Sequence, residues 1–243
     1  MKRVEIRDLF KSYDKYADQT ITVCGWARTI RDSKNIAFLE LNDGAFKSVQ
    51  VVIERANVNN YDEVVKQNVG SSFEVNGKLV LTPNAQQPFE ISAVEIAVLG
   101  GSEADYPLQK KGHSIEFLRS IPTLRARSNL FNAVFRIRSV AAYAIHKFFN
   151  ERNFVYVNTP IITANDCEGA GEMFQVTTLD LDRVASSGKV DYSKDFFGKK
   201  VSLTVSGQLH EECITHAFGK TYTFGPTFRA ENSNTTRHAA EFR

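Results

Sequence analysis

Cysteine is scarce in this sequence. The three cysteines, Cys24, Cys167 and Cys213, are odd in number and far apart, and they lack metal-ligand spacing. This usage argues against a disulfide scaffold and fits a reducing compartment. No apolar run approaches the ~20 residues of a membrane-spanning helix, and the first residues carry charges where a signal peptide needs an apolar stretch. We therefore expect a cytoplasmic protein with no membrane partner.

A strong net charge is missing as well, because 30 basic residues stand against 28 acidic ones. A bulk positive field is thus excluded, and any contact with nucleic acid must come from local clustering. The sequence also contains no P-loop and no GxGxxG string, which excludes a glycine-rich phosphate loop. What is present is a globular composition, 42% hydrophobic and 24% charged over 243 residues, long enough for two domains.

Five short β segments follow one another between residue 20 and about residue 99, separated by turn signals such as Asn-Asp-Gly and Asn-Gly. One short helical pattern, YDEVVKQNVG, lies between the third and the fourth segment. Three strands, a helix and two strands is the order of the OB-fold, a five-stranded barrel that binds oligonucleotides. We expect this barrel in residues 1–100, a linker in 101–126 and a second domain in 127–243.

Alternation along the strands predicts which side chains leave the barrel core. With Ile21, Val23, Leu39, Leu41, Val49, Val51 and Ile53 inward, the predicted outward residues are Cys24, Trp26, Arg28, Phe38, Glu40, Asn42, Gln50, Val52 and Glu54. Arg31 and Lys34 are expected in the turn after the first strand. A ring, an amide and cations on one face suit single-stranded RNA. Two plainer interpretations stay open: cross-strand packing for the ring, and a solvated amide for Gln50.

The second domain mixes helices and strands. Apolar residues recur at helical spacing from Arg127 to about Glu151. A buried strand, FVYVNTPIIT, follows and is closed by Pro160. The segments KKVSLTVSG and KTYTFGPTFRA are also expected as strands, with a helix over QLHEECITHAFG between them.

The string GPTFRAENSNTTRHAAEF carries the chemistry of a nucleotide site. Arg229 and Glu231 are expected on one face of a strand, and Arg237, His238 and Phe242 follow a polar loop. An arginine offers a forked cation to phosphate, a glutamate can accept from a base amino group, and a ring can cover an adenine. Arg237 and His238 can reach the outer phosphates. These residues predict an ATP site.

In these strings the sequence resembles the class II aminoacyl-tRNA synthetases, and within them most closely the asparaginyl-tRNA synthetases. The resemblance runs from GWARTIR and AFLELNDG through VNTPIIT, CEGAGEMF and VSGQL to TFGPTFRAENSNTTRH. It implies an α+β fold: an OB-fold barrel that binds the anticodon, followed by the first part of an antiparallel-sheet catalytic domain. It also implies a homodimer through the long helix and the strand that ends at Pro160, and a second motif from Phe228 to Phe242.

The resemblance also implies residue roles. On the barrel, Phe38 would stack on an anticodon base and Gln50 would read the central base, with Arg28 and Arg31 assisting. In the second domain, the resemblance implies contacts to the amino acid and to the α-phosphate. Glu168 would hold the substrate ammonium in a mobile loop, Gln208 would contact the amino acid, and Arg229 would bind the α-phosphate and the substrate carboxylate as the catalytic residue.

Selection of asparagine over aspartate follows from the helix after Gln208. Aspartate-selective relatives have a lysine there, whereas this chain reads QLHEE. A carboxylate accepts a hydrogen bond from a carboxamide and repels a second carboxylate. Glu212 is the first candidate for the selecting group, and Glu211 is the second.

The chain departs from the family at its end. The glycine-rich third motif and the acidic residues that hold Mg²⁺ would come after Arg243, so no metal ligand is expected in these residues. The resemblance predicts ATP, asparagine, tRNA(Asn) and Mg²⁺ as partners of the complete enzyme, and a chain that is weak or inactive alone. We expect the barrel to fold alone and the second domain to be prone to aggregation. Two alternatives remain: an RNA-binding remnant that uses only the barrel, and a relative that makes or senses asparagine without tRNA.

Overall fold

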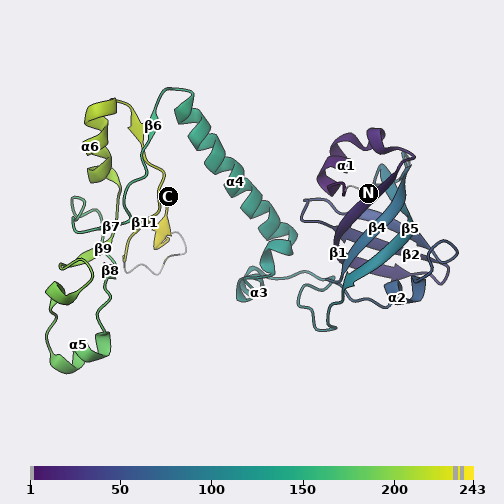
Figure 1. Cartoon of the computed structure of the whole chain (residues 1–243), viewed down its shortest axis with the longest axis horizontal. Coiled ribbons are helices and arrows are strands. Elements are labelled where there is room, and N and C mark those ends of the chain that lie inside the picture. Colours follow the sequence, from purple (N-terminus) through teal and green to yellow (C-terminus); the bar gives the residue numbers. More distant parts are fainter. Residues whose placement is uncertain (1–2, 232–234, 236–237) are drawn as a thin grey trace. The chain divides into compact units, whose positions relative to one another are not determined.

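The computed structural model describes residues 3–231, 235 and 238–243, and it divides into two units, 1–139 and 140–243 (Figure 1). The division falls inside the long helix α4, Asn129–Asn150. The segment 101–126 belongs to the first unit and contains the short helix α3, Ile115–Ser120.

The first unit is built on a closed five-stranded barrel. Its elements are α1 Ile6–Ser12, a 3₁₀ turn at Tyr13–Tyr16, β1 Thr20–Asp32, β2 Ile36–Asn42, β3 Val49–Glu54, α2 Tyr61–Val65, β4 Ser72–Leu81 and β5 Phe89–Gly100. The strand order is β1-β2-β3-β5-β4, and only the β3–β5 pairing is parallel. This arrangement confirms the OB-fold predicted from the order of strands and helix.

Strand β1 closes the barrel because it pairs with β4 over Thr20–Trp26 and with β2 over Trp26–Asp32. Gly25 lies where the two ladders meet, and a Cβ atom there would lie 2.5 Å from the Asn42 carbonyl oxygen. Only glycine therefore allows β1 and β2 to approach this closely.

The barrel core confirms the predicted inward residues. The seven side chains assigned to it are at most 5% exposed: Ile21, Val23, Leu39, Leu41, Val49, Val51 and Ile53. Ile6 and Leu9 of α1 are fully buried in the same core, so the amphipathic helix α1 covers part of the barrel. Burial of each such side chain contributes roughly 1.5–3 kcal/mol.

The outward prediction for Asn42 is wrong, because this side chain is 6% exposed. Its carboxamide organises the turn that follows β2. The Gly44 N–H donates to Asn42 Oδ1 at 2.9 Å, and Asn42 Nδ2 donates to the Ala45 carbonyl at 3.0 Å. A buried polar group must be paired, and here the turn itself supplies the partners.

The second unit contains short elements in three small sheets. After α4 come β6 Val155–Tyr156, β7 Ile162–Thr163, β8 Gln175–Val176, α5 Leu181–Ser187, a 3₁₀ turn at Tyr192–Lys194, β9 Val201–Leu203, α6 Gln208–Phe218, β10 Thr221–Tyr222, β11 Thr227–Phe228 and β12 Glu241–Phe242. The sheets are β10-β6, β11-β12 and β7-β9-β8. The predicted helices over 127–151 and over QLHEECITHAFG are confirmed as α4 and α6.

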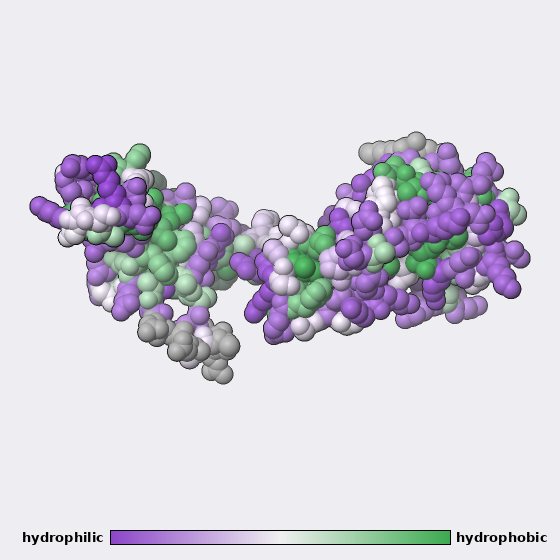
Figure 2. All heavy atoms as spheres, turned by 90° about the horizontal axis from the view of Figure 1, so that it is seen from below, coloured by the Kyte–Doolittle hydropathy of each residue, from purple (hydrophilic) through white to green (hydrophobic). Residues whose placement is uncertain are grey.

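The single buried strand expected over FVYVNTPIIT is wrong. It divides into β6 and β7, and Val155, Tyr156 and Ile162 are 38%, 43% and 39% exposed. Within the described residues, β6 and β7 each pair on one side only, β6 with β10 and β7 with β9. The segment KTYTFGPTFRA divides similarly into β10 and β11. Figure 2 shows hydrophobic side chains at the surface of this unit.

Aromatic packing joins α4 to β10. The rings of Phe149 and Tyr222 stack with centroids 4.4 Å apart, and His146 Nδ1 lies 2.8 Å from the Tyr222 hydroxyl oxygen. Burial raises the pKa of Tyr222. None of the helices in the described part of the chain is long and apolar enough to cross a membrane.

Candidate functional site

A β-bulge in β1 sets the outer face of the barrel. Ala27 pairs with Leu41 and Thr29 pairs with Glu40, so Arg28 is an extra residue in the ladder. The extra residue reverses the alternation after it. Ile30 therefore packs against the core, and Arg31 turns outward.

Arg31 lies within β1, so its placement in the following turn is wrong. It pairs directly with Phe38 of β2, and its guanidinium carbon lies 5.7 Å from the centroid of the Phe38 ring. This cation–π contact leaves an exposed cation beside a half-buried ring. Ala27 and Ile30 are apolar residues separated by three positions, a spacing that breaks the strict alternation of a strand. This spacing was the sequence signal for the bulge.

Gln50 pairs with Glu40 of β2, whereas Phe38 pairs with Val52. The Gln50 side chain donates through Nε2 to Glu90 Oε2 at 3.0 Å, and its backbone N–H donates to Gln87 Oε1 at 3.3 Å. Gln50 is thus a diagonal neighbour of Phe38, with an amide held in one orientation by the adjacent strand β5. A fixed amide can read a base edge.

The end of β1 is held by a buried tyrosine. The Tyr61 hydroxyl donates to Asp32 Oδ1 at 2.6 Å, and the Arg55 guanidinium lies 4.1 Å from the Tyr61 ring centroid. Burial, together with the bond to Asp32, raises the pKa of Tyr61 to about 12. The hydrogen bond from Arg55 lowers the pKa of Asp62. These contacts order the residue next to Arg31.

Arg28 does not join Arg31 and Phe38. As the bulge residue it lines a separate cavity, together with Trp26 and Arg127. The Arg127 guanidinium lies 4.2 Å from the Trp26 ring centroid. Of the four residues predicted to contact RNA, the structure brings together Phe38, Arg31 and Gln50.

Arg229 is the centre of a second cluster, in the second unit. It follows β11, and its N–H donates to the Ala240 carbonyl at 3.0 Å beside β12. Its guanidinium carbon lies 5.2 Å from the Phe242 ring centroid, and its Nη1 lies 4.0 Å from Glu231 Oε1. Arg229 Nε is the one buried side-chain nitrogen or oxygen in the described residues that has no hydrogen-bond partner.

A buried donor without a partner costs roughly 1–3 kcal/mol, and it is the kind of group that a ligand oxygen satisfies. A cation beside an exposed ring and a carboxylate can hold a phosphate next to an amino-substituted base. The predicted association of Arg229, Glu231 and Phe242 is therefore present, but the strand expected to carry Arg229 and Glu231 is wrong, because β11 ends at Phe228. Arg237 lies outside the described residues. His238 is exposed, and its Nδ1 lies 2.6 Å from Thr235 Oγ1.

The loop Cys167–Met173 lies against Arg229. The Ala230 N–H donates to the Glu172 carbonyl at 2.7 Å. A Cβ atom on Gly171 would lie 3.0 Å from Arg229 Cδ and 3.3 Å from Glu231 Oε1. Sequence reasoning missed Gly171, although a glycine in a polar loop is a signal for close backbone approach.

Glu168 lies in the same loop in the left-handed conformation, with φ of 54°, and Gly169 follows with φ of 66°. The Glu168 side chain is exposed. The structure therefore puts Glu168 in the loop beside Arg229, while Gly171 is the residue of that loop whose backbone approaches the Arg229 side chain and Glu172 bonds to the neighbouring Ala230.

The two glutamates of α6 have different partners. Gln208 Nε2 donates to Glu212 Oε1 at 2.9 Å, whereas Glu211 Oε1 accepts from the Thr221 hydroxyl at 3.0 Å. Glu211 thus joins α6 to β10, and Glu212 is exposed at the start of the helix beside Gln208. The Phe228 N–H donates to the Thr204 carbonyl at 2.9 Å, which connects β11 to the segment that leads into α6.

Among the described residues, no group of three or more His, Cys, Asp or Glu side chains could hold a metal ion.

Comparison with protein families gives two matches. Residues 114–243 match the family described as tRNA synthetases class II (D, K and N), and residues 21–99 match the OB-fold nucleic acid binding domain. Asparagine–tRNA ligases of Clostridium tetani and Bacillus cereus are 61% and 58% identical over the whole chain. The chain spans about half of their length, 53% in each case.

Solved structures share the fold. The asparaginyl-tRNA synthetase of Pyrococcus horikoshii complexed with asparaginyl-adenylate superimposes with a TM-score of 0.82 at 22% identity, covering all of this chain and 51% of that one. The asparaginyl-tRNA synthetase of Entamoeba histolytica gives 0.77 at 22% identity, again covering all of this chain and 51% of that one. These similarities confirm the predicted order of domains, an OB-fold barrel followed by the start of a class II catalytic domain.

Proposed function

The chain belongs to the class II tRNA synthetases of the D, K and N group, and from this premise we propose that it supplies the RNA-binding barrel and the Arg229 side of the active site to an asparagine–tRNA ligase of the cytoplasm. The observation that carries the proposal is the buried Nε of Arg229, which has no hydrogen-bond partner among the described residues and lies beside Phe242 and Glu231. The names of the relatives support asparagine as the amino acid.

The proposed reaction has two steps. The asparagine carboxylate attacks the α-phosphorus of ATP and pyrophosphate leaves, which gives asparaginyl-adenylate. The terminal hydroxyl of tRNA(Asn) then attacks the acyl carbon and AMP leaves. Neither step needs a covalent enzyme nucleophile, so the contribution of the protein is positioning and charge stabilisation.

Each residue of the Arg229 cluster has a role in this proposal. Arg229 would hold the α-phosphate and the substrate carboxylate, reducing their repulsion as they approach. Phe242 would cover the adenine, and Glu231 would accept from its amino group. Mg²⁺ would supply charge neutralisation at the outer phosphates when bound, and Arg237 and His238 would assist there.

The amino acid would lie at the start of α6. Gln208 and Glu212 would contact it, with the Glu212 carboxylate accepting from the asparagine side-chain NH2, and Glu168 would hold its ammonium group. On the barrel, Phe38 would stack on an anticodon base and Gln50 would read the central one, with the cations Arg31 and Arg28 assisting. A homodimer through α4 and the β6–β7 segment is part of the same proposal, and α4 exposes apolar side chains such as Val140 and Tyr143 at 67% and 68%.

Exchange of pyrophosphate into ATP tests the proposal. It is measured on this chain alone and on the chain joined to the remaining half of the Clostridium tetani relative. We expect asparagine-dependent exchange in the joined protein, little exchange with aspartate, and loss of exchange in Arg229→Ala. An inactive joined protein beside an active parent enzyme would contradict the proposal.

A second candidate function is RNA binding by the barrel alone. It is favoured by the distribution of buried residues, because the continuous core of the described chain lies in the barrel. This candidate would be favoured if the chain binds an anticodon stem-loop but shows no pyrophosphate exchange, even when it is joined to the remaining half of the Clostridium tetani relative.

A further inference from the structure

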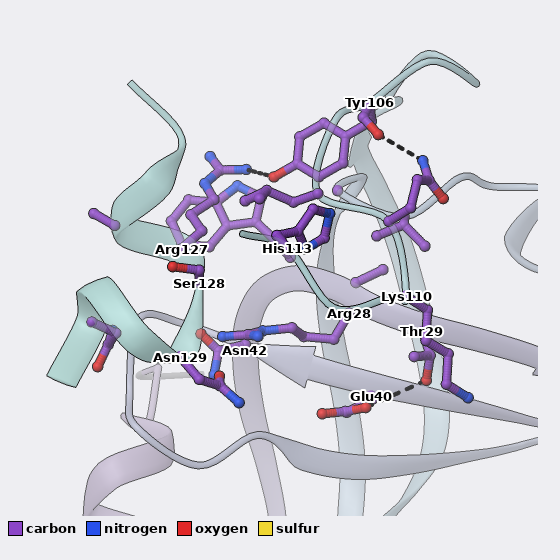
Figure 3. A pocket seen from close by; sticks show the side chains of 18 of the residues that line it. Arg28, Thr29, Glu40, Asn42, Tyr106, Lys110, His113, Arg127, Ser128 and Asn129 are labelled. Atoms are coloured by element: carbon purple, nitrogen blue, oxygen red, sulfur yellow. Dashed lines mark hydrogen bonds between the residues drawn. The ribbon is translucent and has the colours of Figure 1, made fainter. Parts of the chain in front are cut away.

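The first unit contains a cavity of about 610 Å³, and Arg28 is the one lining residue to which the proposed function gives a role (Figure 3). It lies among the bulge of β1, the segment Tyr106–His113 and the first turn of α4, all within the first unit. Its volume falls within the ~300–1,000 Å³ of small-molecule sites.

The cavity is rich in positive charge. Its cationic lining residues are Arg28, Lys110, Lys111 and Arg127, against the carboxylate of Glu40. The Thr29 hydroxyl lies 3.5 Å from Glu40 Oε2. In the described part of the chain, no ion pair engages Arg28, Lys110 or Lys111. Cations without partners around a concave surface favour an anionic ligand.

One wall of the cavity is aromatic and apolar. Trp26 has the Arg127 guanidinium over its ring at 4.2 Å, and Arg127 Nη1 donates to the Tyr106 hydroxyl oxygen at 3.2 Å. Val69, Leu108 and Leu118 also line the cavity. Figure 3 shows Arg28 reaching across the cavity toward the side where Asn42 and Asn129 lie. The ligand should therefore combine a flat ring with an anion.

We propose that this cavity binds a nucleotide, with the phosphate held by Arg28 and the two lysines and the base placed against the Trp26 wall. The nucleotide can be free or part of an RNA strand on the barrel face. Binding of a nucleotide that belongs to an RNA strand rests on the proposed function. This possibility is supported by Glu40, which lines the cavity and is the next outward residue after Phe38 on β2. Successive outward residues on a strand are about 7 Å apart, so the cavity continues the RNA face.

Trp26 is the only tryptophan of the chain, which makes its fluorescence a local reporter of this cavity. The 243-residue chain is titrated with AMP and, separately, with a short single-stranded oligoribonucleotide whose binding is also followed by anisotropy. The variants are Arg28→Ala and, as a matched control on the same strand for the AMP titration alone, Arg31→Ala. Lys110→Ala with Lys111→Ala is a second test on an exposed loop, in case Arg28→Ala fails to fold.

We expect a saturable change in Trp26 fluorescence that Arg28→Ala or the double lysine variant weakens about tenfold or more, as loss of a charge-assisted hydrogen bond predicts. A response to AMP that persists in Arg31→Ala identifies free nucleotide as a ligand. A response to the oligoribonucleotide alone identifies the RNA strand. If neither probe changes Trp26 fluorescence, or if the change is the same in the cavity variants, the proposal is overturned. RNA binding seen by anisotropy with silent Trp26 would overturn it while leaving the barrel function intact.

Discussion

Gln208 and Glu212 form a hydrogen bond one turn apart on α6, with the Gln208 amide nitrogen 2.9 Å from Glu212 Oε1. This carboxylate therefore already accepts from a carboxamide, the group that distinguishes asparagine from aspartate. Glu211 is engaged with Thr221 of β10 at 3.0 Å. The contacts thus favour Glu212 over Glu211 as the selecting residue.

Glu212→Gln should lower kcat/KM for asparagine by roughly 10- to 100-fold, because a hydrogen bond to a charged group contributes about 1.5–3 kcal/mol. It should also raise activity toward aspartate, since the repelling charge is gone. Pyrophosphate exchange in the joined protein measures the activity with asparagine and the activity with aspartate. The matched control is Glu211→Gln, which should leave the asparagine-to-aspartate ratio unchanged. Equal ratios in wild type and Glu212→Gln would reject the assignment.

Phe38→Ala should weaken binding of an anticodon stem-loop by roughly 1–3 kcal/mol, the contribution of one stacked base. Arg31→Ala should weaken it as well, and the two effects should couple by about 0.5–1 kcal/mol because Arg31 lies over the Phe38 ring. Fluorescence anisotropy of the double-mutant cycle measures the coupling. Unchanged affinity in Phe38→Ala would remove stacking from the proposal.

The barrel was predictable because strand alternation, turn residues and one intervening helix all indicate the same fold. Alternation failed where a local rule interrupts it. Arg31 was expected in a turn, but β1 continues through the bulge at Arg28 and places Arg31 outward on the strand. The turn after β2 draws Asn42 inward through hydrogen bonds to Gly44 and Ala45. Both effects depend on backbone geometry, which hydrophobic periodicity does not report.

Gly171→Ala should disturb the Arg229 cluster, because the added Cβ would lie 3.0 Å from Arg229 Cδ. We expect a loss of pyrophosphate exchange of about tenfold in the joined protein, with a larger loss for Gly171→Val. Gly225→Ala is the control, since its nearest neighbour, Thr223 Oγ1, would be 3.9 Å away. Full activity of Gly171→Val would show that the loop does not need close approach.

The Arg229 cluster was predictable in part. Arg229, Glu231 and Phe242 are near one another in sequence and share a hairpin, so chemistry and spacing were enough. Gly171 comes from a distant loop, and its approach depends on tertiary packing. The expected buried strand over 154–163 failed for a related reason: burial depends on which strands cover a segment, and its own residues do not determine that.

Alkaline pH should destabilise the barrel through Tyr61. Its pKa is raised from 10.0 to about 12, so its contribution is fully present below the ordinary tyrosine pKa and is lost as pH rises through about 12. Between pH 10.0 and about pH 12, the melting temperature of the wild type should fall more steeply with pH than that of Tyr61→Phe, which has no phenolic proton to lose. Parallel curves for the two proteins would show that Tyr61 does not carry the effect.

Limited proteolysis of the 243-residue chain should leave a resistant fragment of barrel size from the first unit. The continuous buried core lies in the barrel, whereas the second unit exposes large apolar side chains, including Phe196 at 76% and Phe218 at 60%. Segments with few buried contacts open at low free energy, so the protease reaches them first. Mass spectrometry identifies the fragment, and a chain ending at Ser139 provides the control for independent folding. A single resistant product that extends through Arg243, with none of barrel size, would show that the two units are equally stable.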